Sequence, residues 1–113
     1  MRKFINIVNE GLANDPSLNW RIERVLKTLN DDEFANRVRI CLQVLKQAGP
    51  EGLTKDEWEQ RAREAGAFPT NGSLLTTSHY FDFCVVFVPD GSKDEWGGRQ
   101  GKWVWVEQTK YLN

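Results

Sequence analysis

Few residues of this sequence have the types and spacing that catalysis or metal binding requires. His79 is the only histidine, so a histidine-based triad and a multi-histidine metal site are excluded by count. Cys41 and Cys84 lie in apolar contexts and are expected to be buried thiols rather than metal ligands or a disulfide. The acidic clusters around Asp56 and Asp94 are typical of solvated faces. We therefore expect no catalytic residues, no metal and no cofactor, and a protein that is not an enzyme.

The glycine-rich segment at residues 97–101 also lacks the context of a phosphate-binding loop. Such loops precede a helix, whereas this segment precedes a stretch with the alternating pattern of a strand. It is better interpreted as the tip of a hairpin.

Composition indicates an ordinary soluble chain that is rich in tryptophan. The 113 residues are 40% hydrophobic and 27% charged with a formal net charge of −1, which suits one compact domain. Five tryptophans each bring a large apolar surface that needs a core or a partner. No stretch is apolar enough for a membrane span, and polar residues interrupt the basic opening too early for a secretory signal. We expect a cytoplasmic protein that does not bind membranes.

Two amphipathic helices are predicted within residues 1–30. Apolar residues recur at helical spacing between Arg2 and Leu12, and a second set follows a turn at residues 14–17. The second set is Ile22, Val25, Leu26 and Leu29. Asn19 is placed to cap this second helix. Its apolar stripe must be buried on the rest of the chain or on a second copy, so a homodimer through residues 4–29 is one prediction.

Two further helices are predicted from local capping signals. The first begins at Asp31 or Asp32 and is apolar on two sides, which is typical of the central helix of a domain. Its apolar residues are Phe34, Val38, Ile40, Cys41, Leu42, Val44 and Leu45. After a Gly-Pro turn, Thr54 and Glu57 have the spacing of a capping box and begin a second helix, which Gly66 ends.

The spacing of the apolar residues changes in the last third of the chain. Residues 73–80 are predicted as a short third helix, although several of them are β-branched. From Phe81 to Phe87 apolar residues alternate with a period of two, which is typical of a strand, and Pro89 should end it. A long polar connection then leads to a returning strand over residues 102–107.

This order of elements resembles the winged helix-turn-helix family. The resemblance runs from Phe34 to Glu107: residues 42–49 close the first helix, residues 52–58 open the second, and the two-stranded wing covers residues 83–88 and 101–106. It implies an α+β fold whose third helix enters the major groove of DNA while the wing touches the adjacent backbone. The opening residues also resemble those of small bacteriophage accessory proteins, which would place the protein in a host cytoplasm.

The resemblance assigns nucleic-acid contacts to two sets of residues. Side chains of the third helix able to contact bases and phosphates are Thr70, Asn71, Ser73, Thr76, Thr77 and His79. Basic side chains of the second helix and the wing able to hold phosphates are Lys55, Arg61, Arg63, Lys93, Arg99 and Lys102. However, no arginine or lysine lies between residues 64 and 91, and arginine to guanine is the commonest specific contact.

Charge along the sequence weighs against DNA binding. Residues 1–30 carry a formal charge of +2, whereas residues 31–66 carry −2 and residues 67–113 carry −1. A DNA-binding domain usually shows a basic footprint, and only the predicted N-terminal helices do. The alternative is a module or inhibitor that binds a protein partner without binding DNA, for example a phage protein that targets a host protein.

Three tryptophans bear on this choice. Trp96 lies within the polar wing loop, where it either folds back onto the sheet or stands exposed as an anchor for a partner. Trp103 and Trp105 share one face of the returning strand and are expected in the core.

Together these patterns predict an α+β protein built from two parts. Residues 1–30 form an N-terminal helical extension with a role in dimerisation, and residues 31–113 form a winged-helix domain with a two-stranded antiparallel wing. The leading function is a small non-enzymatic regulator that binds double-stranded DNA in transcription or genome control. Binding to a protein partner is the alternative.

Overall fold

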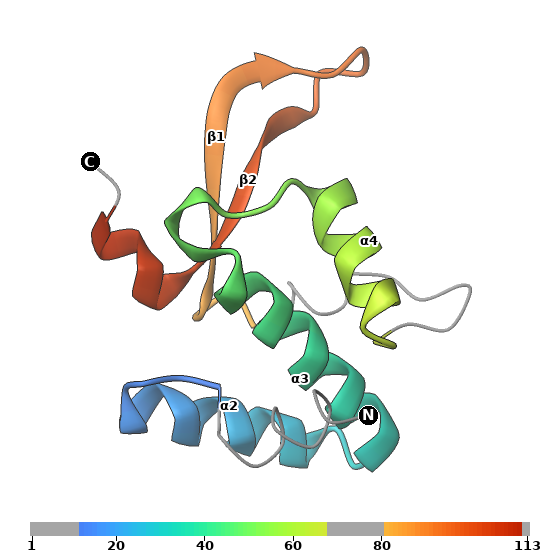
Figure 1. Ribbon diagram of the computed structural model, residues 1–113, viewed down its shortest axis with the longest axis vertical. Helices are drawn as coiled ribbons and strands as arrows, with labels where there is room; N and C mark the ends of the chain where they lie inside the picture. The colour runs from blue at the N-terminus through green and yellow to red at the C-terminus, as the bar shows by residue number, and fades with distance from the viewer. Residues whose placement is uncertain (1–11, 68–80, 112–113) are drawn as a thin grey trace.

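Three helices and a two-stranded antiparallel hairpin make up the part of the chain that the computed structural model describes, residues 12–67 and 81–111 (Figure 1). In chain order these are helices α2 (Pro16–Thr28), α3 (Asp32–Gln47) and α4 (Lys55–Glu64), followed by strands β1 (Val85–Lys93) and β2 (Arg99–Trp105). Short 3-10 turns lie at Gly49–Glu51 (η1) and Val106–Tyr111 (η2). The predicted α+β class is confirmed. The predicted helix at residues 73–80, and all but Leu12 of the one at residues 2–12, lie outside the described residues.

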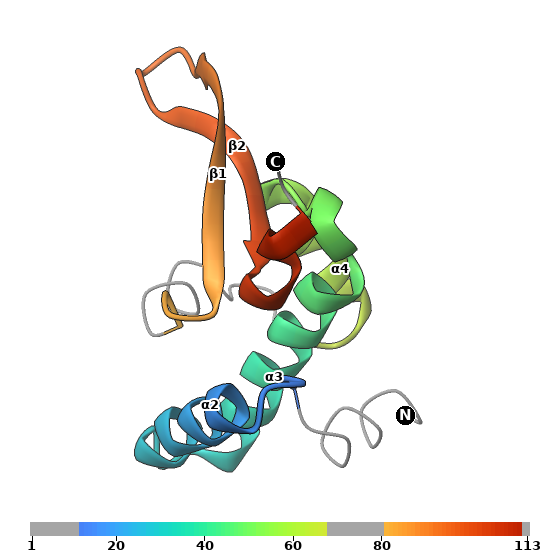
Figure 2. The same ribbon diagram turned by 90° about the vertical axis from the view of Figure 1, so that its left-hand side faces the viewer.

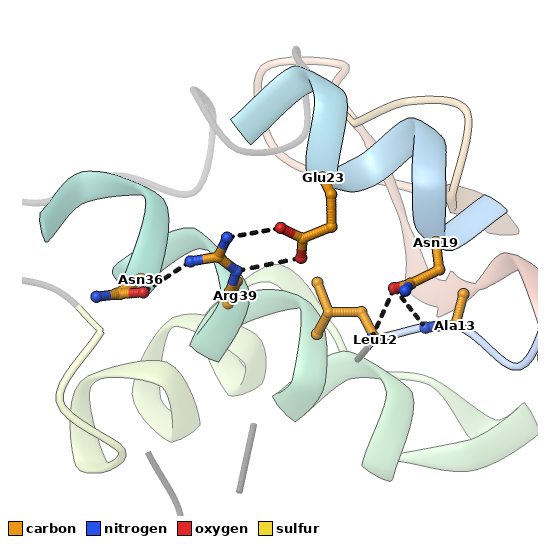
Figure 3. Close-up of polar contacts among 6 residues, drawn as sticks. All are labelled: Leu12, Ala13, Asn19, Glu23, Asn36 and Arg39. Atoms are coloured by element: carbon orange, nitrogen blue, oxygen red, sulfur yellow. Dashed lines mark hydrogen bonds and ion pairs between the residues drawn. The ribbon is translucent and has the colours of Figure 1, made fainter. Parts of the chain in front are cut away.

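Helix α2 begins earlier than predicted, because Asp15 and not Asn19 is its N-cap. The Asp15 carboxylate accepts a hydrogen bond from the Ser17 amide at 2.8 Å, and Pro16 occupies a first-turn position where its missing N–H has no cost. Asn19 lies inside the helix, and its side-chain oxygen accepts the Leu12 amide at 3.0 Å (Figure 3). The prediction of Asn19 as the N-cap is wrong: asparagine and aspartate cap equally well, but Pro16 after Asp15 suits the first turn of a helix and sets the start there.

Helix α3 is central, as its two apolar sides predict. Asp31 caps it by accepting the Phe34 amide at 3.0 Å. Helices α2 and α4 and strand β2 all pack against it. Its buried residues are Ala35, Val38, Ile40, Cys41, Leu42, Val44 and Leu45.

Helix α4 has the predicted capping box and the predicted end. The Thr54 hydroxyl accepts the Glu57 amide at 3.2 Å, and the Glu57 carboxylate accepts the Thr54 amide at 3.0 Å. Gly66, just past the helix, has φ of +88°, a conformation that glycine adopts without strain.

Strand β1 begins later than the alternating pattern predicted. Residues 81–84 form a turn instead, in which the Phe81 carbonyl accepts the amides of Cys84 at 3.0 Å and Val85 at 3.1 Å. Cys84 and Val85 are adjacent and both buried, and burial then decreases along β1 from Val85 to Lys93 without alternating. The pattern of apolar residues does not predict this turn, because the turn depends on hydrogen bonds within the local backbone.

Pro89 does not end β1, contrary to the prediction. Pro89 pairs with Gly101, and an irregularity over residues 90–92 carries the strand on to Lys93, opposite Arg99. There the Asp90 carboxylate accepts hydrogen bonds from the amide and hydroxyl of Ser92. Proline is tolerated in an edge strand beside a bulge. The predicted long connection is therefore mostly strand.

Strand β2 is also shifted from its predicted bounds. It begins at Arg99 rather than at Lys102, and it ends at Trp105 rather than at Glu107 because the chain turns into η2. The Val106 amide still bonds the Cys84 carbonyl at 2.9 Å, which ties the start of η2 to the turn before β1.

A bridge at Leu53 fastens the hairpin to the helices. The Leu53 amide donates to the Trp103 carbonyl at 2.9 Å, and the Trp103 amide donates to the Leu53 carbonyl at 2.7 Å. Trp105 is fully buried, and the half-buried Trp103 packs against Trp58 with ring centroids 6.1 Å apart. The predicted core position of Trp105 is confirmed, whereas Trp103 is only partly buried and packs against the edge of the core. The two hydrogen bonds between Leu53 and Trp103 thus fix the segment between α3 and α4 against β2.

The apolar stripe of α2 is buried within its own chain. Ile22 and Leu26 belong to the same core as the buried residues of α3, and the guanidinium of Arg39 bonds the Glu23 carboxylate across the two helices (Figure 3). The core therefore has no break at the predicted boundary between residues 30 and 31. A homodimer through residues 4–29 stays a prediction, but it cannot use this stripe without opening the core.

Candidate functional site

An open groove of about 390 Å³ lies between the start of α4 and the hairpin. The Leu53 bridge brings the first residues of α4 beside β2, and the hairpin register places Phe87 directly opposite Trp103. These two rings, 5.1 Å apart between centroids, form the apolar part of the wall. The lining residues are Thr54, Lys55, Asp56, Phe87, Asp94, Arg99, Gln100, Gly101 and Trp103.

Two of the predicted phosphate-binding residues meet in this groove. Lys55 comes from α4 and Arg99 from β2, and neither forms an ion pair with another residue of the described ranges. Lys93 lies opposite Arg99 in the hairpin. Lys102 does not line the groove, but its charge helps to lower the pKa of Glu57 at the start of α4. The groove thus gathers basic side chains from elements distant in sequence.

The other two basic candidates lie elsewhere on α4. Arg61 and Arg63 are exposed in its last turn and do not line the groove. The candidates predicted on the third helix, from Thr70 to His79, lie outside the described residues.

Carboxylates offset the positive charge of the groove. Asp56 and Asp94 line it together with Lys55 and Arg99. The pKa of Glu57 lies below its ordinary value, chiefly through its hydrogen bonds with Thr54 and to a smaller extent through the nearby charges of Lys102 and Arg61. Glu57 therefore stays ionised at neutral pH. The groove offers cations without an overall excess of positive charge.

Trp96 stands exposed at the tip of the hairpin, so of the two interpretations the folded-back one is wrong. Its side chain is 86% exposed. Asp94 holds the loop beneath it, since one carboxylate oxygen accepts the amides of Trp96 at 2.9 Å and Gly98 at 2.7 Å. Gly97 has φ of +82°, which favours glycine. The sequence therefore encodes a defined loop that displays an indole ring to solvent.

Sequence reasoning missed two features of the surface. The first is the aromatic wall of the groove, because Trp103 was assigned wholly to the core and Phe87 to a strand face. The second is Trp20 on α2, which is 63% exposed. Helical spacing puts Trp20 opposite the apolar stripe of its own helix, and that signal was available in the sequence.

The cysteines are buried thiols, as predicted, and no disulfide joins them. Burial raises the pKa of the Cys84 thiol to about 12, with the charge of Asp82 acting in the same direction and that of Arg21 against it. Within residues 12–67 and 81–111, no group of three or more histidine, cysteine, aspartate or glutamate side chains is arranged to hold a metal ion.

Comparisons of the chain with protein-family models, with curated proteins and with solved structures find no match. None of the described helices combines the length and the apolar character needed to cross a membrane.

Proposed function

We propose that this protein is a non-enzymatic winged-helix regulator that binds double-stranded DNA in transcription or genome control. The order of α3, α4, β1 and β2 agrees with the resemblance in the sequence. The Leu53–Trp103 bridge holds the hairpin beside the start of α4. A hairpin in this position suits contact with the DNA backbone next to a helix that reads the groove.

The placement of Lys55 and Arg99 carries the proposal. Both line one groove, and neither is engaged in an ion pair within the described part of the chain. Cations without a protein partner can neutralise phosphates and release counterions, which supplies most of the affinity of non-specific DNA binding. Lys93 and Lys102 on the same hairpin extend this set to four phosphate contacts.

Fluorescence anisotropy with a labelled duplex tests the proposal. Four phosphate contacts predict a loss of affinity of about 150-fold between about 50 and 200 mM salt. The double variant Lys55→Glu, Arg99→Glu removes two of them, so its loss over the same range should fall to about 12-fold. Its affinity at the lower salt concentration should also be weaker.

The matched control is the double variant Arg24→Glu, Lys27→Glu, which makes the same change of charge on α2. We expect it to keep the salt dependence of the native chain for duplex DNA. The proposal is wrong if the native chain binds no duplex at low salt, or if the Lys55 and Arg99 variant has an unchanged salt dependence. Circular dichroism checks that both variants remain folded.

The exposed Trp96 supports a second candidate function, the binding of a protein partner. Tryptophan is among the residues that contribute most to protein interfaces, and a loop fixed by Asp94 loses little conformational freedom on binding. In this candidate the winged-helix scaffold serves as an inhibitor or adaptor, for example one encoded by a phage against a host protein.

Affinity capture from nuclease-treated lysate of the native host tests this candidate. The native chain should retain a defined protein, and Trp96→Ala should lose it without a change in unfolding free energy, because the ring is exposed. Trp20→Ala is the matched control and should retain the same protein. An unchanged capture by the Trp96 variant would count against the candidate.

A further inference from the structure

The outward side of α2 carries an aromatic and basic surface that neither proposed function uses. Helical spacing places Trp20, Arg24 and Lys27 on one face, opposite the buried Ile22 and Leu26. At about 1.5 Å per residue, this face spans about 10 Å along the helix. We call these three residues the α2 surface.

The α2 surface borders an open hollow of about 600 Å³. Its described walls are Trp20, Glu23, Arg24, Lys27 and Thr28. The Arg24 guanidinium lies over the Trp20 ring, 5.3 Å from its centroid, in a cation–π contact. The Trp20 indole therefore contacts the Arg24 guanidinium, while most of the indole surface remains exposed and can stack against a planar group of a ligand.

The positive charge of the α2 surface is not cancelled by its own helix. Glu23 is the one acidic residue of α2, and Arg39 of α3 donates to its two carboxylate oxygens at 2.7 and 3.3 Å (Figure 3). Asn36 holds Arg39 from the other side at 2.7 Å. Arg24 and Lys27 form no ion pair with any residue of the described ranges. Their charges are available to an anionic ligand.

The position of the α2 surface separates it from the groove. Figures 1 and 2 show α2 and the tip of the hairpin at opposite ends of the molecule, with α3 between them. A ligand at the α2 surface therefore makes its contacts independently of a ligand at the groove.

We infer that the α2 surface binds single-stranded nucleic acid. A base stacks on Trp20, and Arg24 and Lys27 neutralise neighbouring phosphates. Exposed aromatic rings beside a basic track are the features that recognise single strands, because an unpaired base has a free face to stack. A duplex keeps its bases stacked on one another, and an acidic peptide would engage only the two cations.

Anisotropy with a labelled oligothymidylate of about 12 nucleotides tests the inference. Trp20→Ala should weaken binding by about 5- to 150-fold through loss of one stacked base, and Trp20→Phe should restore part of it. Two phosphate contacts predict about a sevenfold loss of affinity between about 50 and 200 mM salt, and Arg24→Glu, Lys27→Glu should abolish this dependence.

Matched controls separate this inference from the proposed duplex binding. Trp96→Ala and the pair Lys55→Glu, Arg99→Glu should leave oligothymidylate binding unchanged. The inference is overturned if Trp20→Ala binds oligothymidylate as the native chain does. It is equally overturned if polyglutamate displaces the oligonucleotide at equal charge concentration, or if a duplex binds this surface as tightly as the single strand. Displacement by polyglutamate would assign the α2 surface to an acidic protein partner.

Discussion

Replacing Glu107 with glutamine tests how the two ends of the described chain are joined. The Glu107 carboxylate accepts hydrogen bonds from the backbone amides of Asn14 at 3.0 Å and Asp15 at 2.9 Å. It also accepts the indole N–H of Trp105 at 2.9 Å. Glu107 lies in η2, more than ninety residues after Asn14 and Asp15 in sequence. Its side chain thus connects the residues just before α2 to the end of β2.

The size of the effect follows from these three bonds. A hydrogen bond to a charged group contributes about 1.5–3 kcal/mol, and a neutral one about 0.5–1.5 kcal/mol. Glutamine keeps one acceptor oxygen, so its NH₂ group must face a backbone N–H. The contacts to Asn14 and Asp15 are exposed, so water replaces part of what is lost. We expect Glu107→Gln to lower the unfolding free energy by about 1–2 kcal/mol at neutral pH.

The same reasoning gives a dependence on pH. Burial raises the pKa of Glu107, but the hydrogen bonds from Trp105, Asn14 and Asp15, together with the charge of Lys46, outweigh it and leave the pKa below the ordinary 4.5. Because the folded-state pKa lies below the unfolded one, the stabilisation is fully present above the unfolded pKa. It is lost as the pH falls through the folded pKa.

Urea denaturation followed by tryptophan fluorescence measures both effects. The native chain and Glu107→Gln should differ at about pH 7 and converge in acid, as the pH falls through the lowered folded-state pKa of Glu107 and the native carboxyl becomes protonated. Glu51→Gln makes the same chemical change at an exposed position and should change little at neutral pH or in acid. Equal stabilities at neutral pH, or a difference that does not narrow in acid, would refute the reasoning.

Two further predictions concern backbone conformation and thiol reactivity. Gly52 has φ of +67°, and a Cβ there would meet the Trp103 carbonyl, so Gly52→Ala should cost about 3 kcal/mol or more in urea denaturation. At Gly49, with φ of +72° and open space around it, the same change should cost only about 1–2 kcal/mol; equal costs would contradict the close approach. Cys84, with its pKa raised to about 12, and the buried Cys41 should resist a disulfide reagent at about pH 8 until urea unfolds the chain, and stoichiometric labelling of the folded protein would contradict this.

The sequence predicted those elements whose signals are local. The Asp31 cap and the Thr54–Glu57 capping box each satisfy backbone groups within four residues, so their effect can be deduced without the fold. The bounds of the hairpin could not be deduced in this way. They depend on the turn at Phe81, on the irregularity beyond Pro89 and on pairing between strands, which only the assembled chain provides.

The sequence predicts individual residues of the candidate site, but it does not predict the groove that these residues line. Lys55 and Arg99 entered the prediction separately, through the resemblance of their elements to a helix and a wing. Lys55 and Arg99 line the same groove because Leu53 pairs with Trp103. These two residues are fifty positions apart, and no local sequence pattern predicts such a contact. Trp20 is the opposite case, because helical spacing alone places it outside the apolar stripe of α2.

The two exposed tryptophans lie in surroundings of opposite charge, and this divides the proposed ligands between them. Around Trp96, residues 94–98 contain two acidic side chains and no basic one, so phosphates are repelled from the tip of the hairpin. Around Trp20, helix α2 presents arginine and lysine while its one acid is held by Arg39. This contrast in charge agrees with the proposed single strand at the α2 surface, and it suits Trp96 to the proposed protein partner, through an apolar pocket with a basic rim. Because α2 and the tip of the hairpin lie at opposite ends of the molecule, one chain has the geometry to hold both proposed kinds of partner at once.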